Sequence, residues 1–223
     1  RRKKNMPLPY LLKAIDFLLT SKKDELQLHF FGAEPLLLQY EVYAHAFRYA
    51  YEKSGVLNRN LKVIVTTNGA LFNKKWIDLF KKYNIYLEIS LDGAPKSHNI
   101  NRPQRNRGNS YHKIIRHLSP LFAAGINVQV SMVISPKTAD KINENFLHLA
   151  HLGFKKIFMM VANCVHWPEE TLASLKNELK KVEASYPDIS RTYSLTLLNL
   201  RDWVKPMRMN TELAVDVDGS IYS

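Results

Sequence analysis

The sequence predicts an α/β protein whose parallel sheet is built from strand-helix units. Short apolar runs typical of buried strands alternate along the chain with segments whose apolar residues recur at helical spacing. Strands that are separated by helices run parallel, because each crossover returns the chain to the same edge of the sheet. Near-continuous apolar strands fit both a βα barrel and an open doubly wound sheet, so the pattern leaves these two architectures open.

The first expected element is a helix over residues 7–20, in which Pro7 is tolerated in the first turn. Five strand-helix units follow it. The expected strands are residues 25–31, 61–67, 85–91, 126–134 and 155–161. The helices after them are marked by apolar residues at helical spacing: Tyr40, Tyr43, Phe47, Ala50 and Tyr51; Trp76, Ile77 and Phe80; Tyr111, Ile114, Ile115, Leu118 and Leu121; Ile142, Phe146 and Leu149; and Leu172, Leu175, Leu179 and Val182.

The last part of the chain departs from this rhythm. Residues 186–210 show no clean period, so their structure is left open, whereas residues 211–223 alternate around Asp218-Gly219, a strong hairpin signal. We therefore expect three parts: a core over residues 1–185, a connecting segment over 186–210, and the start of a second module over 211–223. A chain of 223 residues with 46% hydrophobic residues can bury a substantial core.

Composition narrows the function classes. The formal charge of +12 is spread over Lys-Lys doublets on expected helix faces, so we expect no nucleic-acid partner from the charge pattern. Arg102, Arg105 and Arg107 form the one local basic patch. The single cysteine, Cys164, excludes an internal disulfide framework and is expected to be a small buried residue. The eight histidines show no metal-ligand spacing and are expected to be structural or solvent-facing. No membrane span or signal peptide is recognised, and we expect a soluble, cytoplasmic protein with no membrane partner.

Polar residues gather where the predicted strands end, and both candidate architectures place functional groups there. The ends read Gly32-Ala33-Glu34-Pro35, Thr67-Asn68-Gly69, Ser90-Leu91-Asp92-Gly93, Ser131 and Asn163-Cys164. Ordinary turn chemistry explains part of this, since Gly, Pro, Asn and Asp form turns and Glu favours a first helical turn. Hydroxyl, amide and carboxylate groups converging on one edge also indicate a ligand site, and we favour that interpretation.

Four segments in order resemble the radical SAM superfamily, in its branch of peptide and anaerobic sulfatase maturases with a C-terminal SPASM or twitch extension. They are "FFGAEPLL", "TTNGALF", "ISLDGAPKSHNINRP" and "ELAVDVDGSIYS". The resemblance implies a partial (β/α)6 TIM-like barrel, of which this chain holds five of six strands, plus the start of the extension. It also implies S-adenosylmethionine lying across the carboxyl ends of the strands and bound to a 4Fe-4S cluster.

The resemblance assigns cofactor-binding roles to six residues. Gly32, Ala33 and Glu34 would accept hydrogen bonds from the methionine ammonium. Ala33 stands where the family usually has a second glycine. Ser90 and Arg102 would hydrogen-bond to the methionine carboxylate and the ribose, because a guanidinium can bind a carboxylate through two parallel hydrogen bonds. Val165 matches the family's adenine contact, which is made mainly through the main chain. Asp92 is expected to organise its own loop through Asx-type hydrogen bonds instead of touching the cofactor.

The family's cysteine loop, C-x-x-x-C-x-x-C, has no match in this sequence. Because iron–sulfur clusters need thiolates, no metal ligand is assigned here, and the cluster cysteines are expected upstream of residue 1 in a longer enzyme. The parent reaction would be reductive cleavage of S-adenosylmethionine to a 5′-deoxyadenosyl radical that modifies a peptide or protein side chain, with an electron donor such as flavodoxin or ferredoxin. This chain alone should be inactive. The alternative is a cluster-free βα-barrel module that binds a nucleoside or nucleic acid.

Overall fold

A computed structural model describes residues 5–32, 34–103, 110–198 and 213–222 of the chain. Its centre is a sheet of six parallel strands in the order β1-β2-β3-β4-β5-β6. The strands are β1 (Glu25–Phe30), β2 (Asn60–Thr67), β3 (Tyr86–Ser90), β4 (Asn127–Ile134), β5 (Lys156–Val161) and β6 (Thr196–Leu197). The predicted parallel α/β architecture is therefore confirmed.

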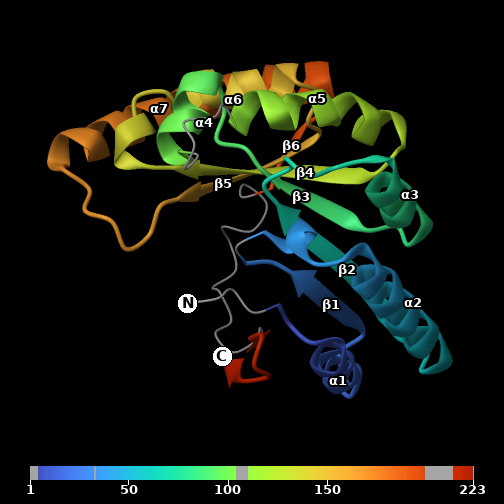
Figure 1. Cartoon of the computed structure of the whole chain (residues 1–223). Coiled ribbons are helices and arrows are strands. Elements are labelled where there is room, and N and C mark those ends of the chain that lie inside the picture. The colour runs from blue at the N-terminus through green and yellow to red at the C-terminus, as the bar shows by residue number, and fades with distance from the viewer. Residues whose placement is uncertain (1–4, 33, 104–109, 199–212, 223) are drawn as a thin grey trace.

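Helices cover one face of the sheet, and the sheet curves so that its other face is concave (Figure 1). The α-helices are α1 (Leu8–Leu19), α2 (Tyr40–Val56), α3 (Lys74–Lys82), α4 (Pro95–Asn101), α5 (Ser110–Ala123), α6 (Ile142–His151) and α7 (Glu169–Tyr193). Two 3-10 turns, η1 (Pro35–Leu37) and η2 (Pro136–Thr138), follow β1 and β4. This one-sided cover is the arrangement of a partial barrel, and it decides between the two architectures that the sequence left open.

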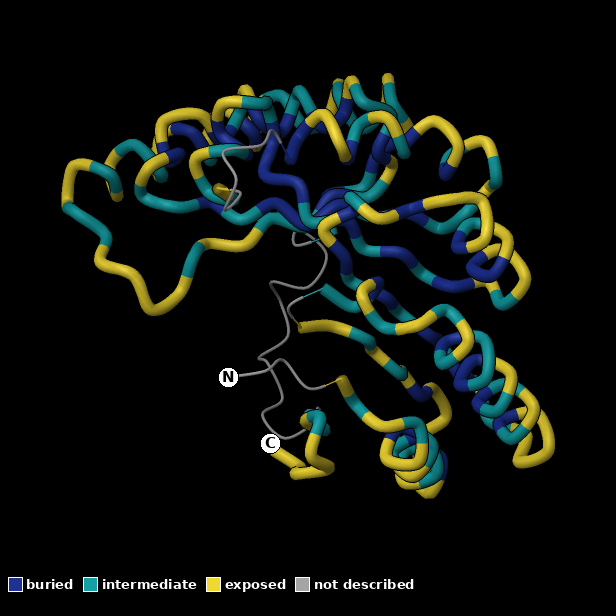
Figure 2. Tube along the Cα trace, viewed as in Figure 1, coloured by how far each residue is buried: buried dark blue, intermediate teal, exposed yellow. Residues whose placement is uncertain are grey.

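The core lies between the helices and the outer face of the sheet, where the dark trace of buried residues concentrates in Figure 2. Its largest fully buried side chains include Tyr43, Phe47, Phe80 and Phe146, all from the predicted helix faces. Burying one such aromatic ring contributes about 1.5 to 3 kcal/mol to stability. Along β2 and β3 every second residue is buried, so the remaining positions face the concave side, which we call the inner face.

The sheet has one strand more than the five expected. Helix α7 continues to Tyr193, through residues whose structure the sequence left open, and ends at Ser194 with a left-handed φ of 49°. The chain then forms β6, which pairs with β5 from Lys156 to Ile157. A two-residue strand has no period to detect, which explains why the sequence did not reveal it. The rest of the expected connecting segment, residues 199–210, lies outside the described residues.

The predicted C-terminal hairpin is present. Strands β7 (Ala214–Val215) and β8 (Ile221–Tyr222) are antiparallel, and a turn whose Gly219 N–H donates to the Asp216 carbonyl closes them. Gly219 lies beside Tyr10, because a Cβ atom there would be 3.6 Å from the tyrosine ring. Within the described ranges, no helix combines the length and the apolar character needed to cross a membrane.

Candidate functional site

The carboxyl ends of strands β1 to β5 lie along one edge of the sheet, which we call the carboxyl rim. Gly32 and Glu34 follow β1, Ser90 ends β3, and Val165 lies in the loop after β5. Arg102 follows α4, which begins five residues after the end of β3. Ala33 lies outside the described residues. The fold therefore brings five of the six predicted residues to one edge.

Glu34 ties the ends of two strands together. Its Oε1 accepts from the Leu36 main-chain N–H at 3.0 Å and from the Thr67 hydroxyl at 2.6 Å, while Oε2 accepts from the Asn68 main-chain N–H at 2.8 Å. The carboxylate caps η1, as the turn interpretation predicts, and also holds the end of β2. A carboxylate offers about four acceptor sites, so this one can accept from a further donor at the rim.

Two hydroxyl groups lie side by side at the middle of the rim. Ser90 and Ser131 are register partners on β3 and β4, and both face the inner side because Ile89 and Val130 beside them are fully buried against the helices. Within the described residues, neither side-chain hydroxyl has a hydrogen-bond partner. Both hydroxyls can therefore donate to a ligand, as the resemblance implies for Ser90.

The Arg102 guanidinium is paired with Asp92. Its Nε and Nη2 atoms donate to Asp92 at 2.8 and 3.0 Å, and the Asp92 carboxylate also accepts from the Val133 main-chain N–H at 2.9 Å. Asp92 is only 1% exposed. Asp92 organises this region as expected, but the expected Asx turn is wrong: the partners described for its carboxylate come from the end of α4 and from β4. A buried carboxylate needs such charged and hydrogen-bonding partners.

His98 on α4 also contacts the segment around Asp92. The Asp92 main-chain N–H donates to His98 Nδ1 at 3.3 Å, and Nε2 lies 3.0 Å from the Ser110 hydroxyl oxygen. Since Nδ1 accepts, the neutral ring carries its proton on Nε2 and donates it to Ser110. The pKa of His98 is lowered to about 4, mainly by burial; the Asp92 charge opposes this shift, and the smaller effect of the Arg102 charge adds to it. His98 is structural, as the sequence predicted.

The buried neutral His98 should make stability depend on pH. An unfolded histidine takes up a proton near pH 6.5, whereas folded His98 does so only near pH 4, so its contribution is lost as pH falls through this window. We expect the free energy of unfolding to fall by about 2 kcal/mol from this group between pH 7 and pH 5. His98→Gln should flatten the dependence in urea unfolding experiments, and His166→Gln in an exposed loop should not. Equal slopes would contradict this role.

Val165 lines a cavity of about 390 Å³ beside the rim. The cavity lies among the end of α4, the η2 turn and the loop after β5, and its other lining residues are Ile100, Asn101, Ser135, Pro136, Lys137, His166 and Pro168. Its mixture of apolar side chains with an amide, a hydroxyl and an ammonium is typical of ligand pockets. Cys164, next to Val165, is exposed and has a φ of 58°, so the prediction that it is buried is wrong. Strand β5 ends at Val161, which leaves Cys164 in the loop.

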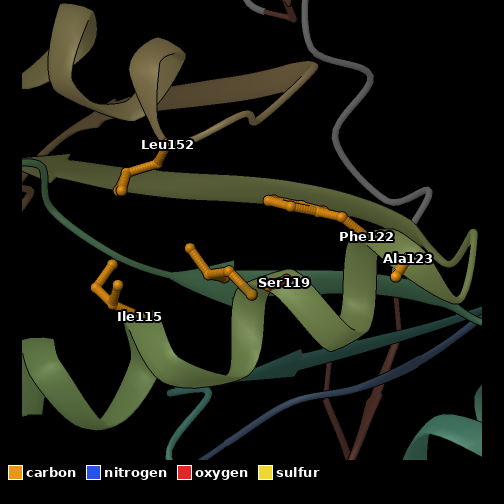
Figure 3. A pocket seen from close by; sticks show the side chains of 6 residues that line it. Ile115, Ser119, Phe122, Ala123 and Leu152 are labelled. Atoms are coloured by element: carbon orange, nitrogen blue, oxygen red, sulfur yellow. The ribbon is translucent and has the colours of Figure 1, made fainter.

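A second cavity, of about 430 Å³, lies in the helix layer and is shown in Figure 3. Ile115, Leu118, Ser119, Phe122 and Ala123 of α5 and Leu152 after α6 line it. The lining has no charged group, and Ser119 supplies its one side-chain hydroxyl. It lacks the converging polar groups of the rim, so we do not regard it as the functional site.

The inner face carries a polar row that the sequence analysis missed. His29 Nε2 lies 2.7 Å from the Thr66 hydroxyl, which donates to Glu88 at 3.2 Å, and the Gln129 amide donates to the other oxygen of Glu88. The row crosses β1 to β4 directly below the rim. Its signal was the polar residue at every second position of strands that we interpreted as continuously apolar.

The described residues contain no group of three His, Cys, Asp or Glu side chains that could hold a metal ion. The whole sequence has one cysteine, and it lies in the exposed loop after β5. These residues therefore do not fit a 4Fe-4S cluster, which is held by several thiolates.

Known proteins share this sequence pattern and fold. The sequence model of the Radical SAM superfamily matches residues 1–150. A cysteine-type anaerobic sulfatase-maturating enzyme of Clostridium novyi is 26% identical over 136 residues, which are 61% of this chain and 36% of that enzyme. The chain thus spans about a third of that relative's length, and the relative belongs to the maturase-like branch that the resemblance indicated.

Two solved structures share the fold. AnSMEcpe with bound AdoMet and Cp18Cys peptide aligns with a TM-score of 0.81 at 18% identity, over 97% of this chain and 65% of that one. Streptococcus suis SuiB bound to the precursor peptide SuiA aligns with a TM-score of 0.57 at 14% identity, over 88% of this chain and 42% of that one. With a superfamily match that covers more than half of its residues, this chain belongs to the radical SAM superfamily.

Proposed function

We propose that this chain provides the S-adenosylmethionine-binding barrel of a radical SAM enzyme that modifies a peptide or protein side chain. The observation that carries the proposal is Glu34, whose carboxylate is fixed by three donors from two strand ends and keeps acceptor capacity at the rim. The methionine ammonium is a cation with three N–H donors, which is the partner that such a carboxylate favours.

The amino end of the cofactor would lie at the end of β1. We assign the main-chain carbonyls of Gly32 and Ala33, together with the Glu34 carboxylate, as its acceptors. Gly32 has a φ of 133°, a conformation that side chains disfavour, and open space surrounds the position of its missing Cβ. Glycine is therefore favoured here by the main-chain conformation and not by a lack of space, and this conformation sets the direction in which the chain runs toward Glu34.

The carboxylate end and the ribose would lie toward the middle of the rim. The unpaired Ser90 hydroxyl supports this assignment, and Ser131 beside it offers a second donor. Arg102 uses two of its five N–H groups on Asp92, so it would reach the ligand with one of the remaining three. In this proposal Asp92 orients Arg102. Because the bidentate contact of the guanidinium is already made with Asp92, Arg102 contributes its charge and a single hydrogen bond to the ligand.

The adenine would occupy the cavity that Val165 lines. Its apolar walls, Ile100 and Val165, suit a flat ring, and the main chain near Val165 offers hydrogen-bonding groups to the ring edge. A cavity of about 390 Å³ lies within the usual size range for small-molecule sites.

Cluster chemistry is assigned to residues other than those in this sequence. In the whole enzyme, S-adenosylmethionine and a 4Fe-4S cluster would together supply a 5′-deoxyadenosyl radical, with electrons from a donor such as flavodoxin or ferredoxin. The role that we propose for this chain is to bind and orient the cofactor and to present the substrate. A peptide or protein substrate is supported by the peptides bound to anSMEcpe and SuiB, which share the fold.

Ser90→Ala tests the site by calorimetric titration of this chain with S-adenosylhomocysteine, which keeps the amino acid and the nucleoside. We expect saturable binding to the unchanged chain and about fivefold weaker binding to Ser90→Ala, since a neutral hydrogen bond is worth about 1 kcal/mol. Ser119→Ala is the matched control: Ser119 lines the second cavity, in the helix layer, and this substitution should leave the affinity unchanged.

Equal affinity of the two variants would exclude Ser90 from the site. Absent binding to the unchanged chain, together with tight binding of an adenosine-rich oligonucleotide, would instead favour a nucleic-acid module.

A further inference from the structure

Two lysines share one aromatic ring on the inner face of the sheet. Lys62 Nζ lies 4.0 Å from the centroid of the Tyr86 ring, and Lys156 Nζ lies 5.8 Å from the same centroid. The three residues come from β2, β3 and β5, and only β4 lies between β3 and β5 in the sheet. A ring attracts a cation weakly and does not neutralise it.

The alternation of the strands places this group on the concave side. Val63 and Ile157, next to the two lysines, are fully buried against the helix layer. Lys62 and Lys156 therefore point the opposite way, toward the concave side of the sheet (Figure 1). We call Lys62, Tyr86 and Lys156 the lysine pair site.

The positive charges of the two lysines are not neutralised by acidic side chains of the described residues. Within the described residues, neither lysine lies within ion-pair distance of a carboxylate. Burial lowers the pKa of Lys62, and the charge of Lys156 lowers it further, while Glu25 on β1 opposes these effects from a distance. Glu88 shares a register row with Lys156, but its carboxylate accepts from Gln129, which lies between them.

We propose that the lysine pair site binds a carboxylate, supplied by an acidic residue of the peptide substrate. Two ammonium groups at one ring can each donate to a carboxylate, and such a ligand would relieve the repulsion between them. The attraction of each ammonium group to the Tyr86 ring helps to preorganise the two lysines for the anion. The identity of the occupant as a substrate peptide rests on the proposed function, whereas the anion site itself rests on the three side chains.

The position of the site fixes where the acidic residue must lie in the peptide. Tyr86, the ring that both lysines share, is four residues before Ser90, which ends β3 at the carboxyl rim, so the site is about 13 Å from the rim at about 3.3 Å per residue. An extended peptide covers the same distance in about four residues. A substrate whose modified residue lies at the rim should therefore carry Asp or Glu about four residues away.

Capped tetraglutamate is the probe, with capped tetraglutamine as its neutral counterpart. Labelled tyrosine resonances report on Tyr86 during the titration of this chain, and calorimetry gives the affinity. We expect tetraglutamate alone to bind and to shift the Tyr86 resonance. Lys62→Gln and Lys156→Gln should each weaken binding about tenfold, as expected for a charge-assisted contact. Lys74→Gln removes the same charge from an exposed position on α3 and should have little effect.

Lys62→Arg keeps the charge and should retain most of the binding, which separates loss of charge from loss of folding. Equal binding by wild type and Lys62→Gln, or a Tyr86 resonance that does not move, would overturn the proposal. The Lys62→Gln variant should bind S-adenosylhomocysteine as wild type does. If wild type does not bind that ligand but tetraglutamate still shifts Tyr86, the cofactor assignment fails and the anion site stands.

Discussion

Gly93→Ala should destabilise the protein by roughly 4 kcal/mol, since positive-φ strain and overpacking each cost about 1 to 3 kcal/mol. Gly93 follows Asp92 and has a φ of 101°, and a Cβ there would lie 2.3 Å from Cβ of Asn145. Asn145 is buried on α6, and its Oδ1 accepts from the Ala94 main-chain N–H at 3.0 Å. Because the overlap involves Cβ of a helical residue, side-chain rotation cannot relieve it, and α6 itself must move.

Urea unfolding followed by circular dichroism measures this effect, with Gly125→Ala as the control. Gly125 also has a positive φ, of 72°, but no heavy atom lies within 4 Å of its missing Cβ. The control should therefore lose only the main-chain term of about 1 to 2 kcal/mol. If both variants were equally stable, the close packing of the β3 end against α6 would be wrong.

The sequence alone could predict the order and direction of the main elements because their signals are local. Phe47 and Phe146 recur with their neighbours at helical spacing, and parallel pairing follows from the helical crossovers. The sequence could not reveal β6, which has two residues, or the exposure of Cys164, which depends on where β5 ends. Closure toward a barrel also depends on the curvature of the whole sheet, which no single strand encodes.

The candidate site was predictable as a location but not as a set of contacts. The rim follows from the parallel strands, since their polar ends must meet at one edge. The pairing of Arg102 with Asp92 joins residues ten positions apart, and Val133 on another strand completes it. Lys62 and Lys156, which are far apart in the sequence, reach the same Tyr86 ring only in the folded sheet. Contacts between residues far apart in the sequence are visible only in the tertiary structure. The sequence therefore indicated which residues lie at the candidate site, but not which partners each of them contacts.

Glu34→Gln should have the second large effect, because a neutral amide cannot reproduce the acceptors of the carboxylate. Oε1 faces the Leu36 N–H and Oε2 faces the Asn68 N–H, so either orientation of the amide places its NH₂ group against a main-chain donor. An unsatisfied donor pair of this kind costs about 1 to 3 kcal/mol. Glu41→Gln, an exposed first-turn residue of α2, makes the same change of charge and should be nearly neutral.

The same Glu34→Gln change tests the proposed ammonium contact by comparing two ligands. S-adenosylhomocysteine carries the ammonium, whereas 5′-methylthioadenosine has the nucleoside without the amino acid. If Glu34 holds the ammonium, the first ligand should bind about tenfold or more weakly, because a charge-assisted bond is lost, while the second should bind as before. Equal weakening of both would mean that the substitution only disturbs the β1 end. Unchanged binding of both would mean that Glu34 is a structural cap for η1 and β2, and that the ammonium lies elsewhere on the rim.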